Sequence, residues 1–283
     1  MAVKILVDST FDFTHEQLKE LGLEVVRLHV RFGNDEYIDG ETMLPQQFYE
    51  RLVESDELPT TSQASPADFA EAYERMTANG DEVVALTISA ELSGTYQSAM
   101  IAAADFPGKV YVVDSRNVTL GAQILARYAC MLAAKGMGAE AMAAELTAAR
   151  ERIHLIALLD TLEYLKRGGR ISSAVALAGG ILSIKPVITI RDGAVAVIGK
   201  ARGSKNGTNL LSQTIEKYGV DFSMPYMLGY TGLSEALLIK YRDDSRRLWE
   251  GHTNELPTMC IGSVVGTHAG PGAIGVAFFA KEQ

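Results

Sequence analysis

Residues 3–22, VKILVDSTFDFTHEQLKELG, decide how the fold is interpreted. The first part, VKILVD, is a short apolar run typical of a buried strand. The second part, THEQLKELG, is typical of a short helix, because Thr14 can cap its first turn and Gly22 can end its last. A buried strand followed closely by a helix predicts an α/β protein.

The same alternation continues through the first half of the chain. Apolar runs predict strands at 24–30, 82–88 and 109–114, and helical spacing of apolar residues predicts helices at 44–55, 65–80, 93–106 and 119–136. Short hydrophobic strands that alternate with helices are typical of a mostly parallel sheet with helices on both faces.

The pattern changes near Ile153. A strand is expected at 154–160, and KPVITI and AVAVIG flank the hairpin signal Asp192-Gly193, so antiparallel pairing is expected here. Helices at 204–219 and 233–250 surround a strand at 225–231, and strands at 257–266 and 274–280 close the chain. We therefore expect an N-terminal α/β domain, 1–152, and a C-terminal α/β domain with a mixed sheet, 153–283.

The expected ligand site is the cleft between these two domains, because clefts of this kind are common binding sites. The loop at 58–66 is expected to face it. The sequence leaves open whether the last strand packs back on the first domain. No internal repeat and no long flexible linker separates the halves.

Composition narrows the function classes. The 283 residues carry 26 Lys and Arg against 35 Asp and Glu, a net charge of −9, which argues against a nucleic-acid partner. The apolar run 174–184 is about half the ~20 residues that span a bilayer, and the N-terminal run is too short for a signal peptide. We expect a cytoplasmic protein, with Cys130 and Cys260 as buried thiols.

Two hydroxyl clusters are candidates for an anion site. Ser93, Gly94 and Thr95 follow a strand at the start of a helix, where unpaired amides and the helix dipole favour an anion. Thr61 and Ser62 form the second cluster. For both clusters, simple helix capping is the alternative.

Asp-Ser pairs end two of the strands, at Asp8-Ser9 and Asp114-Ser115. The carboxyl edge of a parallel sheet is where open α/β folds bind ligands. Ordinary turn chemistry is the alternative, since Asp and Ser bond to the backbone that follows them.

Basic residues form two further candidates. Arg167 and Arg170 flank the pair Gly168-Gly169, and an arginine is a good fixed donor to carboxylates and hydroxyls. Lys200, Arg202 and Lys205 form a basic group on an acidic chain. It is either an exposed strand end or a docking point for a phosphate or an acidic partner.

His268 lies among glycines in VVGTHAGPGAIGV, 264–276, which we interpret as an interrupted strand. No histidine or cysteine is paired at metal-ligand spacing, so no metal site is expected. Walker and dinucleotide motifs are absent. A Ser93–His268–Asp114 triad lacks the G-x-S-x-G elbow of a hydrolase. His268 is then either a donor to a bound anion or a structural histidine.

Seven motifs occur in an order that resembles the DegV family: TTSQAS, LSGTYQSA, DSRNVTLG, LEYLKRGGRIS, KPVITIRDG, KARGSK and GTHAGPGAIGV. The resemblance covers nearly the whole chain. One departure is Ala64, where family members often carry proline.

The resemblance implies a two-domain DegV-like fold that holds a long-chain fatty acid between its domains. The best-understood members are the fatty-acid-binding subunits (FakB) of bacterial fatty acid kinase, which present the carboxylate to a separate ATP-dependent kinase subunit for acyl-phosphate formation and phospholipid synthesis. It implies a carrier that is not itself an enzyme, with no cofactor and with room for transient membrane-surface contact. The implied roles are carboxylate contact for Thr61, Ser93 and His268, pocket shaping for Ser62, Gly94 and Thr95, network support for Arg170 and partner docking for Arg202.

Physical chemistry is compatible with such a ligand. Two hydroxyls and an imidazole can hold a carboxylate without a tight ion pair, and burial of the tail contributes roughly 0.8 kcal/mol per methylene before ordering costs. Residues 119–136 and 174–184 are candidate tunnel walls. Two rivals stay open: a serine-dependent lipid ester hydrolase that uses Ser93 and His268, and a sensor or structural protein that binds lipid only for stability.

Overall fold

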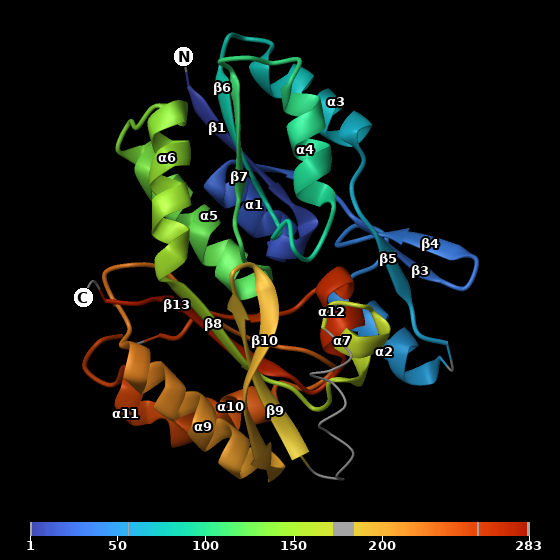
Figure 1. The fold of residues 1–283 in the computed structure, drawn as a ribbon, viewed down its shortest axis with the longest axis vertical. Helices are drawn as coiled ribbons and strands as arrows, with labels where there is room; N and C mark the ends of the chain where they lie inside the picture. Colours follow the sequence, from blue (N-terminus) through green and yellow to red (C-terminus); the bar gives the residue numbers. More distant parts are fainter. Residues whose placement is uncertain (1, 56, 172–183, 254, 282–283) are drawn as a thin grey trace.

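The structure is a computed structural model that describes residues 2–55, 57–171, 184–253 and 255–281 (Figure 1). Two sheets lie one above the other in Figure 1, with a third, smaller sheet at one side. The predicted α/β architecture, with a parallel sheet and a mixed sheet, is confirmed.

The first sheet is parallel throughout, in the order β2-β1-β6-β7. Its strands are β1 (Val3–Asp8), β2 (Leu23–Val26), β6 (Glu82–Thr87) and β7 (Val110–Asp114). Thr87 lies opposite Asp114, and Asp8 opposite Val26, so the strands end at one edge. That edge carries the loops that lead to the candidate site.

Helices cover both faces of this sheet because its strands alternate inward and outward apolar residues. Leu6, Val83 and Ala85 pack with α3 (Pro66–Thr77) and α4 (Thr95–Ala103). Ile5 and Val84 point the other way, toward α1 (His15–Leu21), α5 (Thr119–Ala134) and α6 (Ala139–Ala149). The helix α1 has the predicted Thr14 cap and ends at Gly22 in the left-handed region.

The second sheet is mixed, in the order β10-β9-β8-β13-β11-β12. Its strands are β8 (Ile153–Leu158), β9 (Ile184–Arg191), β10 (Ala194–Arg202), β11 (Tyr226–Tyr230), β12 (Thr258–Cys260) and β13 (Ile274–Phe279). Only β11 and β12 are parallel neighbours. The predicted hairpin at Asp192-Gly193 is confirmed, with both residues at positive φ.

The two faces of the mixed sheet pack against different helices. Its outer face packs on α9 (Gly203–Tyr218), α10 (Ala236–Asp244) and α11 (Arg246–Trp249). Its inner face packs on α5 through side chains such as Leu155, Ala277 and Phe279. The ring of Phe279 lies 5.8 Å from that of Tyr128 on α5. Helix α5 therefore lies between the two sheets.

Several predicted elements are wrong in detail. The run 24–30 is not one strand: it divides into β2 and β3 (His29–Phe32), and β3 joins a separate antiparallel sheet with β4 (Asp35–Ile38) and β5 (Thr60–Ser62). The hydroxyl cluster at 58–66 contains β5 and is not simply a loop. Helix α2 (Pro45–Glu54) lies where it was predicted.

Helices account for the other differences. The residues expected as an interrupted strand form α12 (Ser263–Ala269), and the helix expected at 233–250 is divided into α10 and α11. Helix α6, helix α7 (Glu163–Arg167) and the 3-10 turns η1 (Ser9–Phe11) and η2 (Arg150–Arg152) were not predicted. The candidate tunnel wall at 174–184 lies outside the described residues except for Ile184, which begins β9.

Candidate functional site

A cavity of about 350 Å³ lies where the two large sheets and the small sheet meet. This is within the range of roughly 300–1,000 Å³ that is typical of small-molecule sites. Most of its wall is aliphatic, formed by Leu28, Ile88, Leu92, Leu155, Leu159, Leu165, Ile188, Ile190, Val195, Ile261, Val264 and Ile274. An apolar chain therefore finds apolar neighbours along this cavity.

Five of the eight predicted site residues line this cavity: Thr61, Ser62, Ser93, Arg170 and His268. They come from four separate parts of the chain, namely β5, the β6–α4 loop, the residues after α7, and α12. Gly94 and Thr95 adjoin Ser93 outside the wall, and Arg202 is elsewhere. The fold thus gathers polar groups that are far apart in sequence.

The imidazole of His268 is held against β5. Its Nε2 lies 3.0 Å from Thr61 Oγ1, while its Nδ1 is buried with no hydrogen-bond partner among the described residues. Burial, with the positive charge of Arg170, lowers the pKa of His268 to about 4. The ring is therefore neutral near pH 7.

The unpartnered Nδ1 indicates which tautomer is present. A buried N–H without an acceptor costs more than a bare ring nitrogen, so we assign the hydrogen to Nε2. Nε2 then donates to Thr61 Oγ1, and the hydroxyl hydrogen of Thr61 is left to donate elsewhere. A carboxylate in the cavity is a suitable acceptor.

Ser93 is arranged in a similar way. Its Oγ lies 2.9 Å from Thr95 Oγ1 and accepts from the Thr95 amide at 3.3 Å. Thr95 is fully buried and has no other side-chain hydrogen bond within the described chain. If Thr95 donates to Ser93, the Ser93 hydroxyl is free to donate into the cavity.

Gly94 and Gln63 fix the loop that carries Ser93. Gln63 Nε2 donates to Ser98 Oγ at 2.9 Å and to the Gly94 carbonyl at 3.4 Å. A Cβ on Gly94 would collide with the Gln63 side chain. Gln63 also lines the cavity and was missed as a site residue, although it follows Thr61 and Ser62 directly.

Arg170 ties the residues after α7 to the Ser93 loop. Its Nε donates to the Leu92 carbonyl at 3.0 Å and its Nη1 to the Gly168 carbonyl at 2.7 Å. The side chain is exposed, and these bonds are to backbone oxygens. Arg170 therefore positions the loop beside Ser93.

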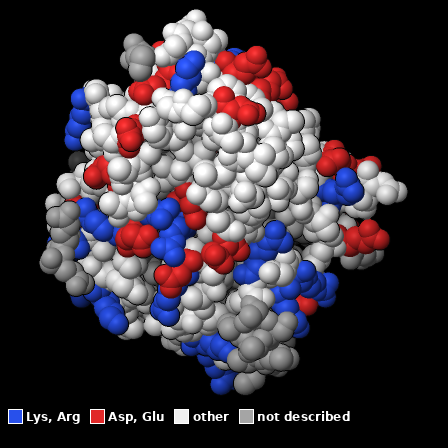
Figure 2. Space-filling model, turned by 45° about the horizontal axis from the view of Figure 1, so that its top comes forward, with Lys and Arg blue, Asp and Glu red and all other residues white. Residues whose placement is uncertain are grey.

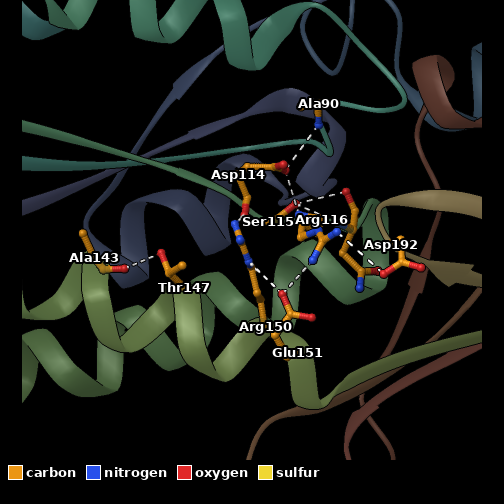
Figure 3. A network of polar contacts seen from close by, with 10 residues as sticks. Ala90, Asp114, Ser115, Arg116, Ala143, Thr147, Arg150, Glu151 and Asp192 are labelled. Atoms are coloured by element: carbon orange, nitrogen blue, oxygen red, sulfur yellow. Dashed lines mark hydrogen bonds and ion pairs between the residues drawn. The ribbon is translucent and has the colours of Figure 1, made fainter.

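The contacts around Asp114 do not support a catalytic triad (Figure 3). Asp114 Oδ1 accepts from the amides of Arg116, at 2.8 Å, and Ala90, at 3.3 Å. Arg150 donates to the Asp114 carbonyl at 2.5 Å, and Glu151 bridges Arg150 and Arg116. Since His268 bonds Thr61 and Ser93 bonds Thr95, the geometry does not support the hydrolase alternative.

Other sequence-based candidates have structural partners. Asp8 accepts from the amides of Thr10 and Ile88, so its carboxylate joins the end of β1 to the residues that follow β1 and β6. Ser115 donates to the Asn117 carbonyl. Helix α5 contributes only its first residues, Thr119 and Leu120, to the cavity wall, because the rest of this helix is packed in the core.

Arg202 is exposed at the end of β10, next to the first turn of α9. This is the end of β10 opposite the Asp192-Gly193 hairpin. Among the described residues, no hydrogen bond or ion pair of its guanidinium is present. Its backbone carbonyl accepts from Asn206.

No group of three or more His, Cys, Asp and Glu is arranged to hold a metal ion in the part of the chain that the structure describes. No helix in that part of the chain has the length and apolar character needed to cross a membrane. The thiols of Cys130 and Cys260 are free and half-buried.

Comparison with known proteins identifies the family. The family profile described as "Uncharacterised protein, DegV family" matches residues 2–281. The chain belongs to the DegV family. It is 37% identical over 283 residues to a DegV domain-containing protein of Deinococcus radiodurans, covering 98% of each chain.

Solved DegV structures have the same fold. A DegV family protein from Thermus thermophilus, described for its fatty acid binding, has a TM-score of 0.89 at 34% identity, covering 99% of this chain and 100% of that one. DegV of Bacillus subtilis, described as a fatty acid binding protein, has a TM-score of 0.85 at 26% identity, with coverage of 99% and 100%. A stearic acid-binding protein from Eubacterium ventriosum has a TM-score of 0.86 at 26% identity, with 99% of each chain covered. Fatty acid binding is thus described for several DegV-family structures.

Proposed function

We propose that this DegV protein binds a long-chain fatty acid in the cavity between its two large sheets. The observation that carries the proposal is the lining of that cavity, which is aliphatic apart from a few polar side chains. Its wall is mostly aliphatic, and its polar groups include the hydroxyls of Thr61 and Ser93 and the neutral imidazole of His268, which contacts Thr61. The fatty acid binding described for similar DegV structures supports it.

The carboxylate is held by Thr61 and Ser93, with His268 behind Thr61. A carboxylate that leaves water costs several kcal/mol unless it receives hydrogen bonds. Thr61 accepts from His268, and Ser93 accepts from the Thr95 amide, which leaves the hydrogen of each hydroxyl for the ligand. Ser62 and Gln63 complete this polar end of the cavity.

The apolar tail supplies most of the affinity. Burying a chain of about 16 carbons contributes on the order of 10 kcal/mol before ordering costs are subtracted. The hydroxyl groups therefore determine where the carboxylate lies more than how tightly the ligand binds. Since the imidazole is neutral near pH 7, it forms no ion pair that would hold back a carboxylate that has to react.

The protein then serves as a carrier that presents the carboxylate to an ATP-dependent kinase subunit, which forms an acyl phosphate. Arg202 is our candidate contact for that partner, because its exposed guanidinium is not committed to another described residue. Figure 2 shows Lys and Arg side chains at the lower right of this face, while Asp and Glu side chains lie at its upper right and across its middle. A partner with an acidic surface would complement the positive charge of Arg202.

Lipid analysis of the purified protein tests fatty acid binding. The protein is denatured, the organic extract is analysed by mass spectrometry, and the delipidated protein is titrated with palmitate. We expect one fatty acid per chain or its uptake on titration. Thr61→Val and Ser93→Ala should each weaken palmitate binding about tenfold or more, because each removes a hydrogen bond to a charged group.

Thr147→Val is the matched control, since Thr147 is exposed on α6 and bonds only the Ala143 carbonyl. It should bind palmitate as the unaltered protein does. A protein that neither carries nor takes up a fatty acid would contradict the proposal. For the partner, Arg202→Ala should keep palmitate affinity and reduce phosphorylation by an added kinase subunit. Loss of palmitate binding in that variant would show that Arg202 has a different role.

A further inference from the structure

Helix α12, which carries His268, does not cap its own first turn. Its first helical residue is Ser263, preceded by Gly262, and no side chain of this segment caps the first amides. Helices leave their first amides without partners inside the helix, and buried amides need acceptors. The acceptors here come from residues more than 200 positions earlier.

Two carboxylates supply them, the buried Asp39 and the half-buried Asp12. Asp12 Oδ1 accepts from the Gly262 amide at 3.0 Å, and Asp39 Oδ1 accepts from the Ser263 amide at 3.2 Å and from the Ser263 hydroxyl. Asp12 follows η1 in the left-handed region, and Asp39 follows β4. Negative charge at this end of a helix is also favoured by the helix dipole.

The same contacts reach the wall of the cavity. Asp12 Oδ2 accepts from Thr119 Oγ1 at 2.6 Å, and Thr119 begins α5 and lines the cavity. His268 stands five residues after Ser263, about 8 Å along the helix axis at 1.5 Å per residue. Gly266, between them, packs directly on Phe48 and Tyr49. A helix this short moves as a unit, so a shift at its first turn displaces His268.

We propose that Asp12 and Asp39 are positioning residues of the head-group site: as carboxylates they hold the first amides of α12 and thereby fix His268 against Thr61, and their protonation loosens this hold. The consequence for binding rests on the proposed fatty acid function. Neither carboxylate lines the cavity.

The surroundings of the pair make its charge sensitive to pH. The titratable and charged groups that face it are Asp8, His15, Arg27, Glu41, Tyr49 and Cys260. Arg27 donates to the Asp39 carbonyl and pairs with Glu41, so its charge is shared. Burial raises the pKa of Asp39, and burial together with the nearby Asp39 charge raises the pKa of Asp12. Protonation therefore begins at a milder pH than for an exposed aspartate.

The titration of the His268 imidazole shows, without any ligand, whether Asp12 and Asp39 hold α12 in place; we call these two carboxylates the anchor. The NMR signal of this imidazole is measured as a function of pH in ligand-free protein. It is the histidine signal that is missing from the spectrum of the His268→Gln variant. We expect Asp12→Asn and Asp39→Asn to raise the His268 midpoint from about 4 toward 6.5, because a released ring gains water. The loss of a nearby negative charge would by itself lower the pKa of His268. A raised midpoint therefore shows that the ring has been displaced.

Asp8→Asn is the matched control. Asp8 is buried like Asp39 and belongs to the same group of acids, yet it bonds Thr10 and Ile88 and no hydrogen bond joins it to α12 among the described residues. It should leave the His268 midpoint unchanged. An unchanged midpoint in both anchor variants, or an equal rise in all three, would overturn the proposal.

A second measurement needs no variant that could fail to fold. In the unaltered protein, amide exchange at 262–264 is compared with that of Val276 in β13 between pH 7.5 and 5.5, after correction for intrinsic rates. We expect protection at 262–264 to fall about fivefold relative to Val276. A constant ratio would overturn the pH dependence.

Palmitate affinity is the separate readout for function. Asp39→Asn should bind palmitate about fivefold more weakly at pH 7.5. If the His268 midpoint rises while palmitate affinity stays the same, Asp12 and Asp39 do position His268, but this positioning does not affect binding.

Discussion

The imidazole of His268 is buried and uncharged beside the other polar groups of the cavity. Burial lowers its pKa to about 4, and its one hydrogen bond goes to Thr61. A neutral ring donates through Nε2 without adding a charge to the site. The unfolded chain has no such burial, so its histidine titrates near 6.5. This difference links protonation of His268 to folding.

The linkage predicts a pH-dependent loss of stability. As pH falls from 6.5 to 4, the unfolded chain takes up a proton at His268 before the folded protein does. The stabilisation is present above 6.5 and is lost as pH falls toward 4, by about 3 kcal/mol for a difference of this size. His268→Gln should lack this loss. Urea unfolding of both proteins at pH 7 and at pH 4.5 measures it.

An equal change in the free energy of unfolding for both proteins would show that His268 titrates normally. Comparing the two proteins cancels the titration of every other group, including His154, whose pKa is also lowered by burial.

Thr61, Ser93 and His268 could be chosen from the sequence because hydroxyls and a histidine stand in motifs that resemble a family's binding motifs. Asp12 and Asp39 could not, since nothing in their own neighbourhood indicates a contact with Gly262 or Ser263. Such pairings are formed by tertiary structure alone.

At the scale of elements, α7 and α12 meet at a glycine. A Cβ on Gly168 would overlap His268 Nδ1, whereas the backbone there, at φ −72°, suits any residue. Gly168→Ala should therefore act only by pushing the imidazole aside. We expect palmitate binding about tenfold weaker, with the free energy of unfolding changed by less than about 2 kcal/mol. Fluorescence titration and urea unfolding measure the two quantities.

The control is Gly138→Ala, at the start of α6. Its φ is −70° and a Cβ there meets nothing within 4 Å. Palmitate affinity should stay as in the unaltered protein. Equal affinities for both variants would mean that the close approach of Gly168 to His268 does not matter for binding.

Elements with strong local signals were predicted and those fixed by distant contacts were not. The capped helix α1 and the Asp192-Gly193 hairpin follow from local chemistry. In contrast, SVVGTHA is rich in β-branched residues, which favour a strand, and contains a glycine, which disfavours a helix, yet it is helical in α12. Its amides are held by Asp12 and Asp39, and Gly266 lets it pack on α2. The three residues of β5 are too short for any periodicity.

At the scale of the whole molecule, the cavity is formed where α5, β5 and α12 meet the inner face of the mixed sheet. Composition and alternation predicted two α/β sheets, and the family resemblance placed a ligand between them. The small antiparallel sheet could not be predicted from the sequence, because β2 and the start of β3 belong to one apolar run, 24–30, which is typical of a single strand.

A ligand shared by both sheets should stabilise the whole molecule. At palmitate concentrations about a hundredfold above Kd, binding contributes roughly 2.7 kcal/mol. For a chain of 283 residues that raises Tm by about 4–5 °C. Calorimetry of delipidated protein with and without palmitate measures the shift, and Ser93→Ala should show a smaller shift at the same palmitate concentration. A Tm that does not respond to palmitate would contradict binding at this junction.

The most direct test is a crystal structure of the delipidated protein soaked with palmitate that carries bromine on its terminal carbon. We predict a carboxylate within hydrogen-bond distance of Thr61 and Ser93, and an anomalous bromine peak inside the cavity among its aliphatic side chains. A bromine peak beside Thr61 and Ser93, or an empty cavity at saturating ligand, would contradict the account.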